Sequence, residues 1–291
     1  MPFALAVLLA SLPDAAALEA RISAVPGAEV SLVYRPLGGG KGLDLRGGAL
    51  VHAASTMKLP VLIELFRRAD AGTLALDQPL LLVNRFKSIA DGSPYQLSPA
   101  DDSETSLYGR VGTRIPLREL AVQMMTRSSN LATNALVELL CVERIQATAR
   151  ALGADTIEVL RGVEDQKAYD RGLVNRTSAR DLAALLEAIE SGRAASAVSC
   201  RAMRDILLAQ ESNGEIPAGL PPHTKVAHKT GSITATLHDA AIVYPSAAQP
   251  YLLVVLTRAI PDEQVARALI VDLSRMVYNA HVARRRSPPR R

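Results

Sequence analysis

Strand-like patterns of apolar and polar residues occur near both ends of the chain. Short runs rich in valine, leucine and isoleucine are bounded there by glycine, proline or charged residues, which is typical of β-strands. The runs that predict strands are 29–37, 43–53, 225–233, 237–245 and 251–260.

Helical patterns fill the middle of the chain and also occur at its two ends. In these longer segments apolar residues recur every three or four positions. The predicted helical segments are 18–25, 56–72, 117–140, 177–192, 199–210 and 262–283. Gly72 and Gly192 end two of them, as glycine often does at a helix C-terminus. Pro60 falls early in its segment, where a helix tolerates the loss of one backbone donor.

This order of elements predicts an α/β fold, with an antiparallel sheet flanked by helices and joined to a mostly helical lobe. The expected sheet domain combines 18–53 with 216–283, and the expected all-helical domain spans 54–215. The cleft between them is the expected site. Residues 1–17 are expected to form a signal or a disordered segment, and 284–291 a basic tail.

The composition is that of a globular protein with a large core. The chain has 291 residues, 48% of them hydrophobic. Five of its 33 basic residues lie in the tail, which leaves 28 basic against 29 acidic residues elsewhere. With three phenylalanines and no tryptophan, a nucleic-acid partner is not expected.

Other partners and cofactors are also not expected. No apolar run reaches the ~18 residues of a membrane span, and the five histidines lack the spacing of zinc ligands. We therefore expect a monomer that acts on a small molecule or a peptide, without a metal or another cofactor.

Ser55-Thr56-Met57-Lys58 is the first motif with chemical meaning. A serine hydroxyl is a poor nucleophile at neutral pH and must lose its proton to a nearby base as it attacks. If the segment is helical, residues three apart share one face, so Lys58 can reach Ser55. Taken alone, the motif is better explained by a helix N-cap followed by a surface lysine.

Two further motifs follow in order, Ser128-Ser129-Asn130 and Lys229-Thr230-Gly231. Ser128 lies 73 residues after Ser55, and Lys229 lies 101 residues after Ser128. They add a second hydroxyl, an amide and a second cation. All three motifs occur in the order of a motif set with a known catalytic use. Together they therefore favour a catalytic site over three chance matches.

At these residues the chain resembles the class A serine β-lactamases and the related penicillin-recognising enzymes. Segment 117–140 is similar to the helical hairpin that carries the second motif. Segment 229–245 is similar to the active-site strand and its neighbour. The resemblance covers about 18–283 and implies acyl transfer to serine.

The motifs and the resemblance together imply a role for each residue in acylation. Ser55 attacks a carbonyl carbon, and Lys58 takes its proton directly or through water. The backbone N–H groups of Ser55 and Ser232 are the family-like candidates for the oxyanion hole. Ser128 hands a proton to the leaving nitrogen.

The remaining residues are expected to hold the substrate. Asn130 holds its amide side chain, and Lys229 places a cation near its carboxylate, with Thr230 or Ser232 as hydrogen-bond donor. Gly231 has no side chain, so the substrate can lie close against the strand. Tyr108 is expected to form an aromatic wall of the pocket.

The chain departs from the family pattern in three places. Ser129 stands where the family usually has aspartate in the second motif. The family's Glu-x-x-Leu-Asn motif is absent: Arg161 fits the opening arginine of that loop, and the glutamate position falls near Val163. Glu164 is the nearest carboxylate, and it is either the deacylating base or a solvated loop acid.

The third departure is that no arginine follows Lys229 within ten residues. Arg258 is a distant alternative, and His238 either lines the site or caps a strand. The polar segment 84–106 is interpreted mainly as a surface insertion, with a cleft rim as the alternative.

Three functions remain open. The favoured one is a serine β-lactamase; the second is a D,D-peptidase or an esterase of the same fold. The third is a penicillin-binding or sensing module that is acylated on Ser55 and stays acylated. The apolar run 3–12 lacks a preceding basic residue, but together with the resemblance it favours a periplasmic or secreted protein.

Overall fold

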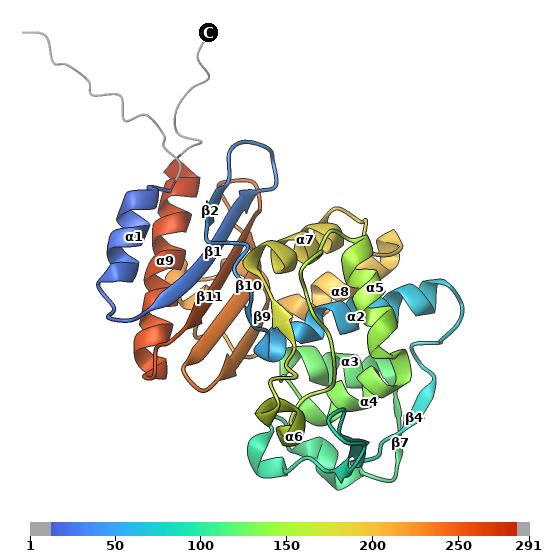
Figure 1. Cartoon of the computed structure of the whole chain (residues 1–291). Coiled ribbons are helices and arrows are strands. Elements are labelled where there is room, and N and C mark those ends of the chain that lie inside the picture. The colour runs from blue at the N-terminus through green and yellow to red at the C-terminus, as the bar shows by residue number, and fades with distance from the viewer. Residues whose placement is uncertain (1–12, 284–291) are drawn as a thin grey trace, which may run out of the picture.

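A five-stranded antiparallel sheet forms one half of the molecule (Figure 1). The computed structural model describes residues 13–283. The strand order is β2-β1-β11-β10-β9. The strands are β1 (Glu29–Pro36), β2 (Leu43–Leu45), β9 (Lys225–Ile233), β10 (Thr236–Tyr244) and β11 (Tyr251–Arg258). The first and last segments of the chain therefore share one sheet, which confirms the predicted fold class.

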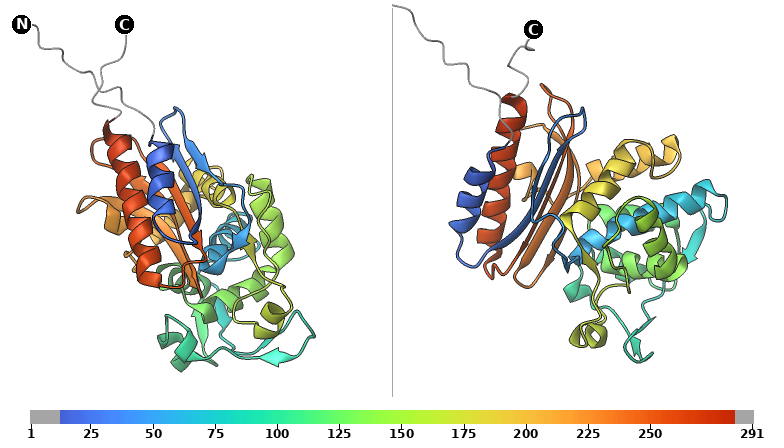
Figure 2. Two further views of the ribbon diagram at one scale, coloured as in Figure 1. Left: turned by 60° about the vertical axis from the view of Figure 1, so that its left-hand side comes forward. Right: turned by 45° about the horizontal axis from the view of Figure 1, so that its top comes forward.

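Helices cover both faces of this sheet. Helices α1 (Ala15–Ser23) and α9 (Glu263–Ala283) lie side by side on one face, and the helical lobe covers the other (Figures 1 and 2). Every β10 residue from Leu237 to Val243 is buried, whereas an antiparallel sheet with one solvated face would alternate. Two apolar cores result, one on each side of the sheet.

The other half of the molecule is mostly helical. Its helices are α2 (Lys58–Asp70), α3 (Leu117–Thr126), α4 (Asn130–Leu140), α5 (Val142–Ala151), α6 (Gln166–Asp170), α7 (Ala179–Glu190) and α8 (Ala197–Leu208). Short 3-10 turns are η1 (Ala54–Met57), η2 (Pro99–Asp101), η3 (Ser106–Arg110) and η4 (Pro217–Gly219). Helix α2 lies at the centre, with every residue from Lys58 to Phe66 buried, so apolar residues surround its first turns.

The predicted strand 43–53 is wrong as a single element. Only β2 joins the main sheet, and β3 (Val51–His52) pairs with β8 (Arg176–Thr177) instead. Arg46, with a φ of 52°, turns the chain between them. The other short pairs are β4 (Pro79–Leu81) with β7 (Arg114–Pro116), and β5 (Phe86–Lys87) with β6 (Pro94–Tyr95). The β3–β8 pair delivers the chain directly to η1.

The first helix begins earlier than the sequence pattern indicated. Asp14 accepts a hydrogen bond from the Ala16 N–H, and this cap starts α1 at Ala15 rather than at Leu18. The last part of the 1–17 segment thus belongs to the folded unit, whereas its first 12 residues and the basic tail lie outside the described residues. Within residues 13–283, no helix is long and apolar enough to cross a membrane.

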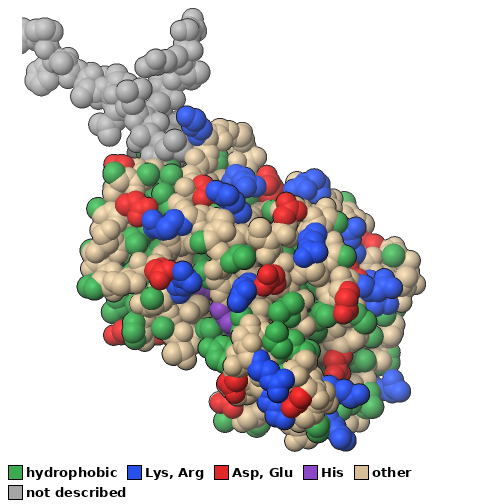
Figure 3. Space-filling view, in the orientation of Figure 1, with side chains coloured by type: hydrophobic (Ala, Val, Ile, Leu, Met, Phe, Trp, Pro, Cys, Tyr) green, Lys and Arg blue, Asp and Glu red, His purple; other side chains and the backbone are tan. Residues whose placement is uncertain are grey.

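Charges of both signs are interspersed on the face shown in Figure 3, without a basic stripe. A histidine is visible there, where the surface is hollowed between the two halves. This distribution agrees with the near-neutral balance of the chain without its tail.

Candidate active site

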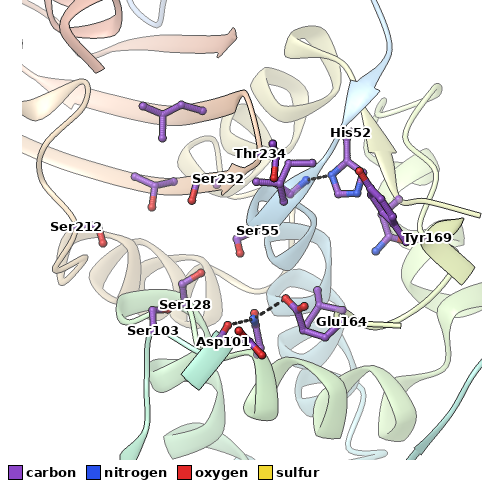
Figure 4. Close-up of a pocket in the computed structure, with 18 of the residues that line it drawn as sticks. His52, Ser55, Asp101, Ser103, Ser128, Glu164, Tyr169, Ser212, Ser232 and Thr234 are labelled. Atoms are coloured by element: carbon purple, nitrogen blue, oxygen red, sulfur yellow. Dashed lines mark hydrogen bonds between the residues drawn. The ribbon is translucent and has the colours of Figure 1, made fainter. Parts of the chain in front are cut away.

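Ser55 lies in the turn η1, where the chain passes from β3 into α2. Ala54 has a φ of 45°, and its N–H donates to His52 Nδ1 at 3.0 Å. Such a φ is unfavourable for a residue other than glycine and persists only where the surroundings enforce it. Ser55 opens into a cleft of about 740 Å³ (Figure 4).

Strand β9 lies directly against this turn at Gly231. A Cβ atom on Gly231 would lie 2.9 Å from the Ser55 nitrogen and 3.1 Å from the Thr56 nitrogen. Glycine is therefore required by close approach, and it brings the strand edge with Thr230 and Ser232 into the cleft beside Ser55. Ser55 and Ser232 thus line one cavity, as the two donors of an oxyanion hole must.

Lys58 is fully buried beneath the cleft floor. Its Nζ donates to the Ser128 carbonyl oxygen at 2.6 Å and to Asn130 Oδ1 at 2.8 Å, and lies 3.1 Å from Ser128 Oγ. Burial, followed by the charge of Lys229, holds the pKa of Lys58 well below its usual value. The lowered pKa favours the neutral Lys58 amine, which can accept a proton.

Ser128 joins the two lysines. Lys229 Nζ donates to Ser128 Oγ at 3.0 Å and to the Thr230 carbonyl oxygen at 2.8 Å. Burial lowers the pKa of Lys229 to about 7, although the charges of Asp239 and Glu215 oppose this shift. Among the described residues, no hydrogen bond joins Lys58 directly to Ser55, so Ser128 or a water molecule must link them.

Glu164 reaches the cleft from the loop before α6. Its Oε1 accepts a hydrogen bond from Asn130 Nδ2 at 3.1 Å, and its backbone has a φ of 60°. Glu164 is partly exposed to solvent. The burial of the rest of its carboxyl group, together with the charge of Asp101, raises its pKa, and the charge of Lys58 opposes this shift. A carboxylate thus lines the same cleft as Ser55, from the residue that follows Val163.

Val163 is fixed by backbone contacts to α4. Its N–H donates to Asn134 Oδ1 at 2.6 Å, and its carbonyl oxygen accepts from Asn134 Nδ2 at 3.0 Å. Val163 also lines the cleft. Near the family's glutamate position, the cleft wall is therefore apolar at Val163.

The polar segment 84–106 is not only a surface insertion. Asp101 and Ser103, at its C-terminal end, line the cleft opposite Ser55 (Figure 4). The Tyr108 hydroxyl donates to Asp102 Oδ2 at 3.0 Å, and Tyr108 is not among the residues that line this cleft. Its role as an aromatic wall of the pocket stays a prediction.

The structure also decides the roles of His238 and Arg258. His238 is fully buried, with Nε2 donating to the His52 carbonyl oxygen at 2.9 Å and Nδ1 accepting from the Thr257 N–H at 3.2 Å. Burial lowers its pKa, so it joins β10 to β3 as a neutral side chain. Arg258 pairs with Glu29 and does not line the cleft.

Several residues of the cleft could not be found from the motifs. Arg267 reaches it from α9, where it pairs with Glu215 and Glu263. His52, Arg161, Tyr169 and Ser212 line it as well. Nearness to the first motif was the signal for His52, the family loop pattern indicated Arg161, and no signal marked Arg267. Within residues 13–283, no group of His, Cys, Asp or Glu could hold a metal ion.

A serine hydroxyl beside amines of lowered pKa is the arrangement by which serine hydrolases form acyl-enzymes. The chain belongs to the beta-lactamase enzyme family, whose model matches residues 14–281. This confirms the resemblance inferred from the three motifs.

Individual relatives agree with the family model. β-Lactamase AST-1 of Nocardia asteroides is 28% identical over 269 residues, which cover 90% of this chain and 82% of that protein. The structure of PBP-A is 27% identical with a TM-score of 0.79, covering 91% of this chain and 94% of PBP-A. A β-lactamase of Sphaerobacter thermophilus is 25% identical with a TM-score of 0.78, covering 91% and 96% of the two chains.

Proposed function

We propose that this protein hydrolyses the amide bond of β-lactams through an acyl-enzyme on Ser55. The observation that carries the proposal is the meeting of two buried lysine amines at Ser128, beside Ser55. The name of AST-1 and the acyl-enzyme complex of a PBP-A L158E mutant with penicillin G support a β-lactam as the substrate.

Acylation proceeds as follows in this proposal. The Ser55 oxygen attacks the lactam carbonyl carbon while its proton passes to the Lys58 amine, through Ser128 or water. The N–H groups of Ser55 and Ser232 stabilise the oxyanion. The C–N bond then breaks, and Ser128 protonates the leaving nitrogen and regains a proton from Lys58.

Deacylation requires a water molecule and a base. Glu164, near Asn130 and the cleft, takes a proton from water as the water oxygen attacks the ester carbonyl carbon. The bond from that carbon to the Ser55 oxygen breaks, Ser55 recovers a proton, and the opened acid leaves. Thr230 and Arg267, which line the cleft, hold the substrate's carboxylate, and the buried Lys229 behind Ser128 adds its positive charge.

One observation favours a second function. Val163, near the position of the family's usual glutamate, is apolar, and Glu164 is already hydrogen-bonded to Asn130. Both features favour slow deacylation, as in a D,D-peptidase or a penicillin-binding module. Mass spectrometry of the protein mixed with a penicillin, from seconds to hours, separates these functions. An adduct on Ser55 that disappears as product forms supports the β-lactamase, and a persistent adduct supports the second function.

Glu164→Gln is expected to slow deacylation about 10²- to 10⁴-fold, the range for loss of a positioned base. The amide keeps its size but cannot accept the proton of water, so the acyl-enzyme should accumulate in the same time course. Asp170→Asn is the matched control, because Asp170 lies on α6, is not among the cleft-lining residues and accepts a hydrogen bond from Gln166. Unchanged turnover of Glu164→Gln would assign deacylation to another group.

Gly231→Ala is expected to lower the acylation rate about 100-fold, since an added methyl group must push β9 away from the turn that holds Ser55. Overpacking should also destabilise the fold by about 1–3 kcal/mol. Stopped-flow acylation and urea unfolding measure the two effects. Gly109→Ala serves as the control, because its Cβ would meet nothing within 4 Å. A wild-type acylation rate in Gly231→Ala would exclude the close approach as a requirement.

A further inference from the structure

The segment Asp101–Glu104 lies alongside the second motif and is bonded to it repeatedly. Ser103 Oγ donates to the Arg127 carbonyl oxygen at 2.7 Å, and the Arg127 guanidinium pairs with Glu104 at 2.9 Å. Glu104 is buried. A segment that the sequence pattern assigned to the surface therefore holds the backbone from which Ser128 and Asn130 project.

Asp102 makes the central contacts of this segment. Its side chain is only 8% exposed. Its carboxylate accepts from the Asn130 N–H at 3.0 and 2.9 Å and from the Leu131 N–H at 3.0 Å. The Tyr108 hydroxyl and the Glu104 N–H, at 3.0 and 3.1 Å, complete its shell. The carboxylate thus satisfies the free N–H groups that begin α4.

The residue that this contact stabilises is strained. Ser128 has a φ of 60°, which a non-glycine residue adopts only where its surroundings enforce it. Ser129 caps α4 through Ala132 at 3.2 Å, but it brings no charge to the helix N-terminus. The carboxylate that the family usually carries at position 129 is therefore supplied by Asp102, from 27 residues earlier in the sequence.

We propose that Asp102 is a positioning residue for acylation, which fixes Ser128 and Asn130 against Lys58 and sets the charge around the Lys58 amine. This inference rests on the proposed acylation of Ser55. The charged groups that face Lys58 are Lys229 on β9, Glu164 before α6 and Asp102 after η2. Of these, Asp102 and Glu164 favour the protonated amine, and Lys229 opposes it.

Asp102→Asn tests the proposal, because it keeps the size of the side chain but removes the charge and turns an NH₂ group toward backbone donors. The acylation rate constant, measured per folded molecule with a fluorescent penicillin, is expected to fall about 10- to 100-fold. Without the negative charge, the pKa of Lys58 falls further, so the acid limb of the rate profile should move to lower pH. A role in folding alone would not move this limb.

Asp181→Asn is the matched control. Asp181 is a buried carboxylate that caps α7 through the Ser178 N–H, away from the cleft. Its loss should lower the melting temperature and leave both the acylation rate and the limb unchanged. A fall of less than fivefold in Asp102→Asn, or a lower rate with an unmoved acid limb, would overturn the proposal.

A second reagent separates this inference from the proposed function. If the wild-type protein does not react with penicillin, the proposed function fails, and a fluorophosphonate then reports the reactivity of Ser55. With that reagent, we expect the reaction rate of Asp102→Asn to fall by the same factor and the acid limb of its pH profile to move to lower pH in the same way. Equal fluorophosphonate reactivity of the variant and the wild type would overturn the positioning role independently.

Discussion

Ser55→Ala is expected to abolish covalent labelling by a penicillin reporter, with a loss of at least ~10³-fold. Ser55 lines the cleft at the start of the buried helix α2, and its hydroxyl makes no hydrogen bond among the described residues. Ser128 Oγ is held by both lysines, so it is not free to attack. Intact-protein mass spectrometry, followed by peptide mapping, measures the loss.

The control for Ser55→Ala is Ser199→Ala, which removes a partly buried hydroxyl of α8 that bonds Asp70, outside the cleft. Ser55→Ala should melt near the wild-type temperature, because the Ser55 hydroxyl makes no hydrogen bond among the described residues. Ser199→Ala loses the hydrogen bond to Asp70 and should melt lower, but it should be labelled like the wild type. Labelling that persists in Ser55→Ala would refute the assignment of the nucleophile and the mechanism built on it.

Lys58→Ala is expected to lower the acylation rate about 10²- to 10⁴-fold, the range for loss of a positioned general base. Burial and the charge of Lys229 favour the neutral Lys58 amine, so the wild-type protein has its base ready near neutral pH. Lys87→Ala, which removes an exposed lysine on β5, is the control. A rate within threefold of wild type in Lys58→Ala would place the base elsewhere.

The two lysines also predict the pH dependence of acylation. Lys58 must be neutral to accept a proton, so the rate should fall on the acid side as Lys58 becomes protonated. Lys229 must be charged to attract a carboxylate, and with a pKa of about 7 it loses that charge above this pH. A bell-shaped profile is expected, and loss of the acid limb in Lys58→Ala, measured by stopped-flow, would assign that limb.

The sequence by itself determined the three motifs and the class of fold. Hydrophobic periodicity and glycine stops are local properties, so the helix that ends before Gly72 and the strands at both chain ends could be predicted without any contact. The motif residues follow from chemistry that needs a hydroxyl, an amine and an amide in one place. The structure brings Ser55, Lys58, Ser128 and Lys229 to one end of the cleft, as that chemistry requires.

The tertiary structure alone decided which distant residues complete the site. Asp102 bonds the start of α4, Arg267 reaches the cleft from the last helix, and the Tyr108 hydroxyl donates to Asp102. His238 likewise became a link between strands only once β10 lay beside His52. Such contacts join segments that lie far apart in the sequence, and local hydrophobic periodicity does not indicate which distant segments meet. They depend on loop conformation and on burial, which only the folded packing of both halves creates.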